Sequence, residues 1–151
     1  MDEELLSWLD KYAFNEEAKF SPINYAQKSY KMFVDEVKKG FTTRLCCFAT
    51  SHLQSTLELM HQLEEAGVVS YVGLVAMDRN APTGVKQKDA STALKDYEEY
   101  IIASQSNQFC KPIITPRFLP SCSDELMRGL ATLRKKYDLP SQSHLNENRS
   151  E

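Results

Sequence analysis

The sequence lacks the features that mark the common nucleotide-binding, membrane-spanning and nucleic-acid-binding proteins. It has 5 glycines in 151 residues, and no segment matches the G-x-G-x-x-G or Walker pattern, which excludes the usual phosphate-binding turns. Its apolar runs are far shorter than the roughly 20 residues that cross a bilayer. The net charge of -3 leaves no basic excess to neutralise a phosphate backbone, so nucleic acid is not an expected partner.

Cysteine is scarce and poorly spaced for metal or disulfide chemistry. Cys46 and Cys47 are adjacent, while Cys110 and Cys122 stand alone without a C-x-x-C pair. This spacing suits neither a thiolate zinc site nor a disulfide framework, so reduced and mostly buried thiols are expected. Acidic residues follow Met1 where a leader would carry Lys or Arg, and we therefore expect a cytoplasmic protein.

What the sequence does contain is an alternation of helical and strand patterns. Apolar residues recur at helical spacing after Ser21, Ser51 and Ser123, which are the predicted N-caps, and again over 94–102. Pro22 fits the first helical position. Short runs rich in apolar and β-branched residues predict strands at 42–50, 71–77, 111–118 and 139–144. The polar segment 79–88 is a predicted loop.

This alternation predicts an α/β fold of parallel strands covered on both faces. Two architectures fit it: an open doubly wound sheet, and a (β/α)8 TIM-like barrel. A complete barrel needs roughly 200 residues or more, so a barrel here would be a partial one, about half of the whole. With 42% hydrophobic residues, the chain has enough apolar material for one domain with a real core.

Polar residues follow two of the predicted strands, at the edge where parallel α/β folds bind ligands. Arg117 and Phe118 end one strand. Taken alone, they also fit a surface ion pair and a core aromatic. His144 ends the next predicted strand and Glu147 follows it, so the two can converge only if the chain turns after His144. The asparagines at 146 and 148 favour such a turn.

A histidine beside a glutamate is by itself a common polar pair, because a catalytic zinc site needs about three protein ligands. The other two histidines, His52 and His61, lie in or beside the helix that follows residue 51, and we expect them on its surface.

Several motifs in order resemble guanine deaminase of the amidohydrolase superfamily. TPRF at 115–118, SCS at 121–123 and QSHLNEN at 142–148 carry the resemblance most strongly. It extends upstream through LLSWL at 5–9, GFTT at 40–43, FATSH at 48–52 and GLVAMD at 73–78. Essentially the whole chain is covered.

The resemblance implies roles for residues that match the family's motifs. His144 matches a ligand of the single metal ion, usually zinc, and Glu147 matches the carboxylate that shuttles a proton. Arg117 and Phe118 match the pair that contacts guanine, for which a guanidinium fork and an aromatic ring are suited. Trp8 matches an aromatic near the substrate. The family further implies a homodimer in its intact form.

The resemblance also implies that parts of the catalytic barrel are missing from 1–151. The family's His-x-His strand belongs ahead of this sequence, and its later strands, with a histidine and an aspartate ligand, belong after it. The small β-sandwich domain is absent too. The expectation is therefore an internal fragment of the enzyme, with His144 as its one expected metal ligand.

Two alternatives stay open on the sequence. Another deaminase or a chlorohydrolase of the same superfamily shares the HxxE element, although Arg117 and Phe118 favour guanine. Alternatively, the chain is a truncated product without catalytic activity, acting only as an interaction or dimerisation piece.

Overall fold

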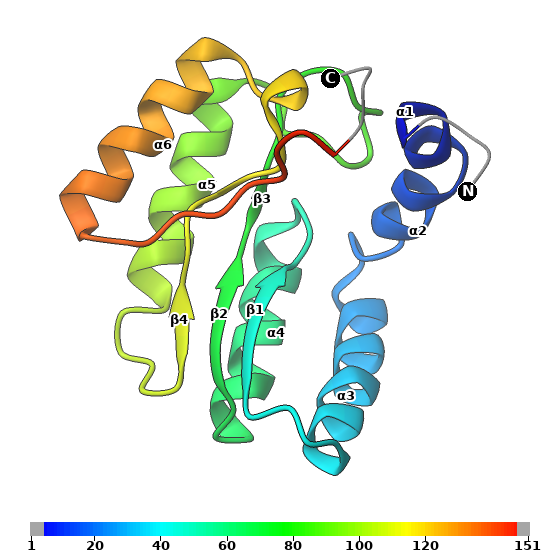
Figure 1. The fold of residues 1–151 in the computed structure, drawn as a ribbon, viewed down its shortest axis with the longest axis vertical. Coiled ribbons are helices and arrows are strands. Elements are labelled where there is room, and N and C mark those ends of the chain that lie inside the picture. Colours follow the sequence, from blue (N-terminus) through cyan, green and yellow to red (C-terminus); the bar gives the residue numbers. More distant parts are fainter. Residues whose placement is uncertain (1–4, 148–151) are drawn as a thin grey trace.

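The computed structural model describes residues 5–147, in which helices alternate with parallel strands (Figure 1). Three short helical segments come first: α1 (Leu5–Trp8), the π-helical turn η1 (Leu9–Ala13) and α2 (Phe14–Ala18). They are followed by α3 (Ile23–Lys39), β1 (Arg44–Phe48), α4 (Leu53–Glu65), β2 (Val69–Gly73) and β3 (Val75–Ala76). The remaining elements are α5 (Ala90–Ala103), β4 (Cys110–Pro112), β5 (Thr115–Pro116), the 3-10 turn η2 (Leu119–Ser121) and α6 (Asp124–Tyr137).

The strands lie side by side in the order of the chain. β1, β2 and β4 form one parallel sheet, and β3 pairs in parallel with β5. The segment after α6 continues the series, because Ile114 forms a parallel bridge with Ser141. A doubly wound sheet reverses its strand order and carries helices on both faces. The order within residues 5–147 does not reverse, which favours the partial barrel.

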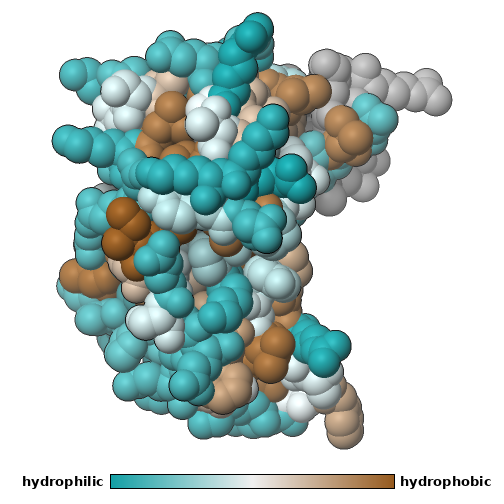
Figure 2. All heavy atoms as spheres, turned by 90° about the vertical axis from the view of Figure 1, so that its left-hand side faces the viewer, coloured by the Kyte–Doolittle hydropathy of each residue, from teal (hydrophilic) through white to brown (hydrophobic). Residues whose placement is uncertain are grey.

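The helices cover one side of these strands. α4 and α5 lie against that side, with α6 beside α5 (Figure 1), and the main core between them includes Leu63, Val72 and Leu126, each 0% exposed. The outer surface over α5 and α6 is mostly hydrophilic (Figure 2). On the other side, Val69 and Tyr71 are 46% and 43% exposed. The predicted cover on both faces is thus not found at these two residues. The inner face of a barrel is covered by side chains from all of its strands, and a partial barrel supplies only some of them.

The predicted strand over 71–77 is divided into β2 and β3, and a tyrosine of α5 accounts for the break. Tyr97 is fully buried. Its hydroxyl accepts a hydrogen bond from the Thr115 N–H at 2.9 Å and donates one to the carbonyl oxygen of Leu74. The hydroxyl thus stands between two backbone groups that would otherwise pair directly in a parallel ladder.

A second tyrosine repeats this bridge one helical turn later. The Tyr100 hydroxyl accepts from the Ile113 N–H at 3.1 Å and donates to the Val72 carbonyl oxygen. The predicted strand over 111–118 is divided into β4 and β5 for the same reason. Burial raises the pKa of both tyrosines above their ordinary value, so the hydroxyls stay protonated and can donate.

One predicted N-cap is confirmed and two are wrong. The Ser123 side chain accepts from the N–H three residues further on, at 3.1 Å. The helix after Ser21 begins later, with Pro22 itself in the cap position and no side-chain cap. His52, rather than Ser51, occupies the cap position of α4 and makes no capping hydrogen bond.

The last predicted strand, 139–144, is not a regular strand. Only the Ile114–Ser141 bridge is formed, although Gln142 and His144 also donate their N–H groups to the carbonyl oxygens of Ile114 and Arg117, at 2.9 and 3.0 Å. Within residues 5–147 this segment has a neighbouring strand on one side only, which leaves its other edge without a ladder.

The four cysteines are free thiols. Cys110 and Cys122 are buried, and burial raises the pKa of Cys110 to about 11 and that of Cys122 in the same direction. Cys46 is exposed and Cys47 half-buried, so the prediction of mostly buried thiols holds for two of the four. No helix within 5–147 is both long and apolar enough to cross a membrane.

Candidate functional site

The residues singled out by sequence lie together at one end of the strands. Trp8, Arg117, Phe118, His144 and Glu147 line a single pocket of about 140 Å³, with Leu9 as the remaining lining residue. Trp8 comes from α1, and Arg117 and Phe118 follow β5. His144 ends the 139–144 segment, and Glu147 lies just after it. Residues more than a hundred positions apart are thus brought together by the fold.

The ring of His144 is held in one orientation. Its Nδ1 lies 2.8 Å from the main-chain carbonyl oxygen of Arg117, and its ring centroid lies 4.3 Å from that of Phe48 at the end of β1. A carbonyl oxygen only accepts, so Nδ1 is the donor in this hydrogen bond, and Nε2 is the ring nitrogen left to bind a metal ion. Metal-binding histidines are oriented in this way by a hydrogen bond from the second nitrogen.

The chain turns after His144, as the sequence predicts. Asn146 has a φ of 54°, in the left-handed region that asparagine tolerates better than most residues. The turn brings Glu147 back to the pocket that His144 lines. Asn148, the other predicted turn residue, lies outside the described residues.

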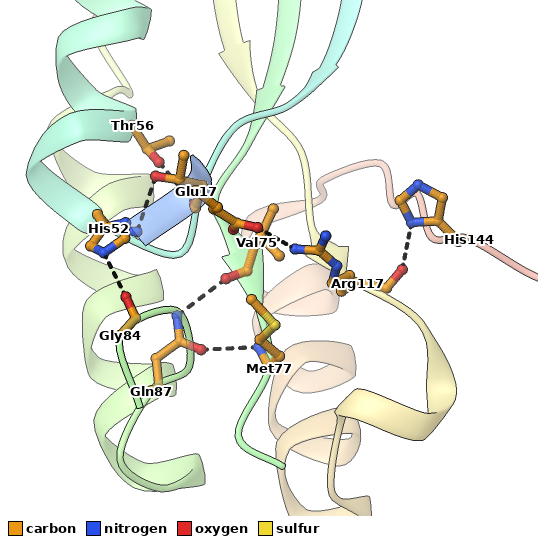
Figure 3. Close-up of polar contacts among 10 residues, drawn as sticks. Glu17, His52, Thr56, Val75, Met77, Gly84, Gln87, Arg117 and His144 are labelled. Atoms are coloured by element: carbon orange, nitrogen blue, oxygen red, sulfur yellow. Dashed lines mark hydrogen bonds and ion pairs between the residues drawn. The ribbon is translucent and has the colours of Figure 1, made fainter. Parts of the chain in front are cut away.

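Arg117 makes an ion pair that the sequence left without a named partner. Its Nη1 lies 2.6 Å from Oε2 of Glu17 on α2, and the two side chains are only 15% and 11% exposed. The guanidinium carbon lies 5.0 Å from the centre of the Phe14 ring. Figure 3 shows Arg117 between Glu17, which its side chain contacts, and His144, which its carbonyl oxygen contacts. No sequence pattern links residues 17 and 117.

Phe118 is both a core residue and a pocket residue, the two interpretations that the sequence allowed. It is 3% exposed and packs in a second hydrophobic cluster with Leu9, Phe14 and Met77. It also lines the pocket. Trp8 packs against the same cluster and is half-buried.

The prediction that His52 lies on the helix surface is wrong, while His61 is exposed as predicted. His52 is half-buried, and its Nε2 donates to the carbonyl oxygen of Gly84 at 3.1 Å. Burial lowers the pKa of His52, whereas the Gly84 carbonyl and the charge of Glu17 oppose that shift.

The loop 79–88 is anchored by a buried glutamine that the sequence did not single out. Gln87 is 6% exposed. Its Oε1 accepts from the Met77 N–H at 2.9 Å, and its Nε2 donates to the carbonyl oxygen of Val75 at 3.1 Å (Figure 3). The same Nε2 also donates to the carbonyl oxygen of Ser51 at 3.2 Å. A polar residue in a polar segment carries no local signal of burial, so only the tertiary structure reveals this anchor.

The described residues do not form a complete metal site. No three histidine, cysteine, aspartate or glutamate side chains in 5–147 are grouped so that they could hold a metal ion. His144 can supply one nitrogen ligand, but a catalytic zinc ion needs about three protein ligands.

The family to which the chain belongs follows from comparison with known proteins. The family model described as "Amidohydrolase family" matches residues 2–151. The chain belongs to the amidohydrolase family. The similar guanine deaminases support the resemblance seen in the motifs: the proteins from Dictyostelium discoideum and Homo sapiens are each 37% identical to it, over 97% and 100% of the chain respectively.

Solved structures agree with this assignment. The crystal structure of guanine deaminase from C. acetobutylicum, with guanine bound in its active site, superposes with a TM-score of 0.94 at 49% identity over 99% of the chain. The chain covers 36% of that protein, and 33% and 34% of the two curated relatives. The chain therefore spans about a third of the length of these relatives. Its fold is a partial amidohydrolase barrel.

Proposed function

We propose that this chain is part of a guanine deaminase, which in its intact form hydrolyses guanine to xanthine and ammonia. The observation that carries the proposal is the single pocket lined by all five residues to which the resemblance assigns a role. The 49% identity to a guanine deaminase with bound guanine supports the same substrate.

In this proposal Arg117, Phe118 and Trp8 bind the purine. A guanidinium presents donors to the O6 and N7 acceptors of guanine, whereas an adenine would present an amino donor at the same edge. The aromatic residues supply apolar contact for the flat ring. Arg117 therefore favours guanine over adenine, whose amino group is a donor at the edge where guanine has O6.

Glu147 is the proposed general acid–base. A carboxylate at this place can take a proton from the attacking water and pass it to the departing amino group. The turn at Asn146 supports the role because it brings Glu147 to the same pocket as the purine-binding residues.

We propose one zinc ion for the intact active site, with His144 as one of its ligands. When bound, zinc lowers the pKa of a coordinated water to near neutral. The hydrogen bond from Nδ1 of His144 to the Arg117 carbonyl suits a ligand that binds through Nε2. The other ligands would come from residues outside this chain. The homodimer of the intact family stays a prediction.

The 151-residue chain by itself is proposed to be inactive, because it brings a single expected ligand to the metal. The lack of further expected ligands also supports the alternative that the chain, as a stable product, is only an interaction or dimerisation piece. The exposed strand face around Val69 and Tyr71 would be available for such contacts.

The test compares the 151-residue chain with a longer protein that contains it. Both are dialysed, analysed for zinc, and assayed for the absorbance change from guanine to xanthine. We expect zinc and turnover in the longer protein only. Turnover by the 151-residue chain would contradict the fragment proposal, and a longer protein that prefers a chlorinated triazine or an adenine nucleoside would favour the other superfamily activities.

A further inference from the structure

The ion pair between Glu17 and Arg117 differs from the other ion pairs of the described residues. Its side chains are 15% and 11% exposed, whereas those of the other pairs are between 41% and 73% exposed. Exposed pairs are screened by water and contribute little, but a buried pair holds its geometry, and loss of one partner leaves a buried charge.

The segment that carries Glu17 contacts Arg117 twice. Phe14 and Glu17 are three residues apart on α2, so they lie on the same helical face. Glu17 bonds Nη1 of Arg117 at 2.6 Å, and the Phe14 ring lies 5.0 Å from the guanidinium carbon. Phe14 is 4% exposed. The hydrogen bond and the ring contact together restrict the position of the guanidinium.

We infer that Glu17 is a positioning residue for purine recognition, a conclusion that rests on the proposed guanine deaminase function. An arginine side chain loses considerable rotamer entropy when it binds a ligand, and a group already held in place loses less. A guanidinium has five N–H donors, and Glu17 engages Nη1. Donors therefore remain for the two acceptors at the O6 and N7 edge of guanine.

The structure separates this role from metal binding. Glu17 contacts the side chain of Arg117, whereas His144 contacts its main-chain carbonyl oxygen. Removal of the Glu17 charge should therefore weaken guanine binding and leave the orientation of His144, and hence the zinc content, unchanged. A residue that mattered only for folding would reduce both together.

The test uses Glu17→Gln in the longer protein, with Glu16→Gln as the matched control. Glu16 is the neighbouring residue, and its carboxylate makes an exposed pair with Lys19 at 2.6 Å. For Glu17→Gln we expect KM for guanine to rise about tenfold, the effect of losing a charged hydrogen bond. The value of kcat should change by less than about twofold, since the reacting groups are untouched. Glu16→Gln should have the same KM and kcat as the longer protein without a substitution.

A double-mutant cycle shows whether Glu17 acts through Arg117. In an Arg117→Ala background, Glu17→Gln should cause no further rise in KM, because the group that it positions is gone. Glu17→Asp, which keeps the charge on a shorter side chain, should show a smaller rise in KM than Glu17→Gln.

Three results would overturn the inference: an unchanged KM in Glu17→Gln, equal additional losses with and without Arg117, or a parallel loss of kcat, zinc and thermal stability. All three results are read only if the unsubstituted longer protein deaminates guanine. If it does not, the proposed function is wrong, and the assay of the unsubstituted protein shows this before any variant is made.

Discussion

The main-chain carbonyl oxygen of Arg117 accepts the hydrogen bond that orients the His144 ring, at 2.8 Å from Nδ1. One residue thus serves two proposed purposes, because its side chain lines the pocket proposed to bind the purine and its backbone holds a proposed metal ligand. The two purposes can be separated by mutation, since a substitution at position 117 leaves the carbonyl oxygen in place.

Arg117→Ala and His144→Ala should therefore differ in metal content. In the longer protein, Arg117→Ala should keep its zinc and weaken guanine binding by about 1–3 kcal/mol, the usual range for loss of a fork-like donor to a base edge. His144→Ala should lose the zinc, because it removes a direct ligand. Metal analysis after dialysis, together with KM for guanine, distinguishes the two. Zinc retained by His144→Ala would contradict the ligand assignment.

Glu147→Gln should nearly abolish turnover while leaving zinc content close to that of the parent. Glutamine fills the same space but cannot take up the proton, and general acid–base groups contribute about 10²- to 10⁴-fold to the rate. Steady-state kinetics of the longer protein measures this loss in kcat. An active Glu147→Gln enzyme would rule out the proton-transfer role.

Tyr97→Phe and Tyr100→Phe should each destabilise the chain by about 1–3 kcal/mol, because each leaves a buried backbone N–H and carbonyl without a partner. Urea denaturation of the 151-residue chain measures the change. Tyr71→Phe is the matched control, since Tyr71 is 43% exposed. An effect no larger than that of the control would show that the two hydroxyl bridges do not stabilise the fold.

His52 should make the folded chain less stable in mild acid. Burial lowers its folded-state pKa below the ordinary value of 6.5, so the unfolded chain takes up the proton first and the free energy of unfolding falls as the pH drops below 6.5. Urea denaturation of the parent chain and of His52→Asn between about pH 7 and pH 5 tests this. His61→Asn, at an exposed position, is the matched control. An unchanged pH dependence in His52→Asn would contradict the prediction.

Much of the fold could be predicted because it depends on neighbouring residues. Helical periodicity and short apolar runs located α3 to α6 and the main strands, and one of the three predicted caps, Ser123, was right. The caps at Ser21 and Ser51 were wrong because a serine before an apolar run is compatible with several helix starts. The breaks at Leu74 and Ile113 depend on tyrosines that are distant in sequence.

The sequence by itself determined the alternating α/β pattern, the family resemblance and five of the six residues that line the pocket. These rest on local periodicity and on motifs that are contiguous in the chain. Only the tertiary structure decided that Glu17 pairs with Arg117, that Gly84 accepts from His52, and that the tyrosine hydroxyls divide the sheet. A polar side chain has many chemically equivalent partners in a sequence, and packing alone selects the one that it meets when it is removed from water.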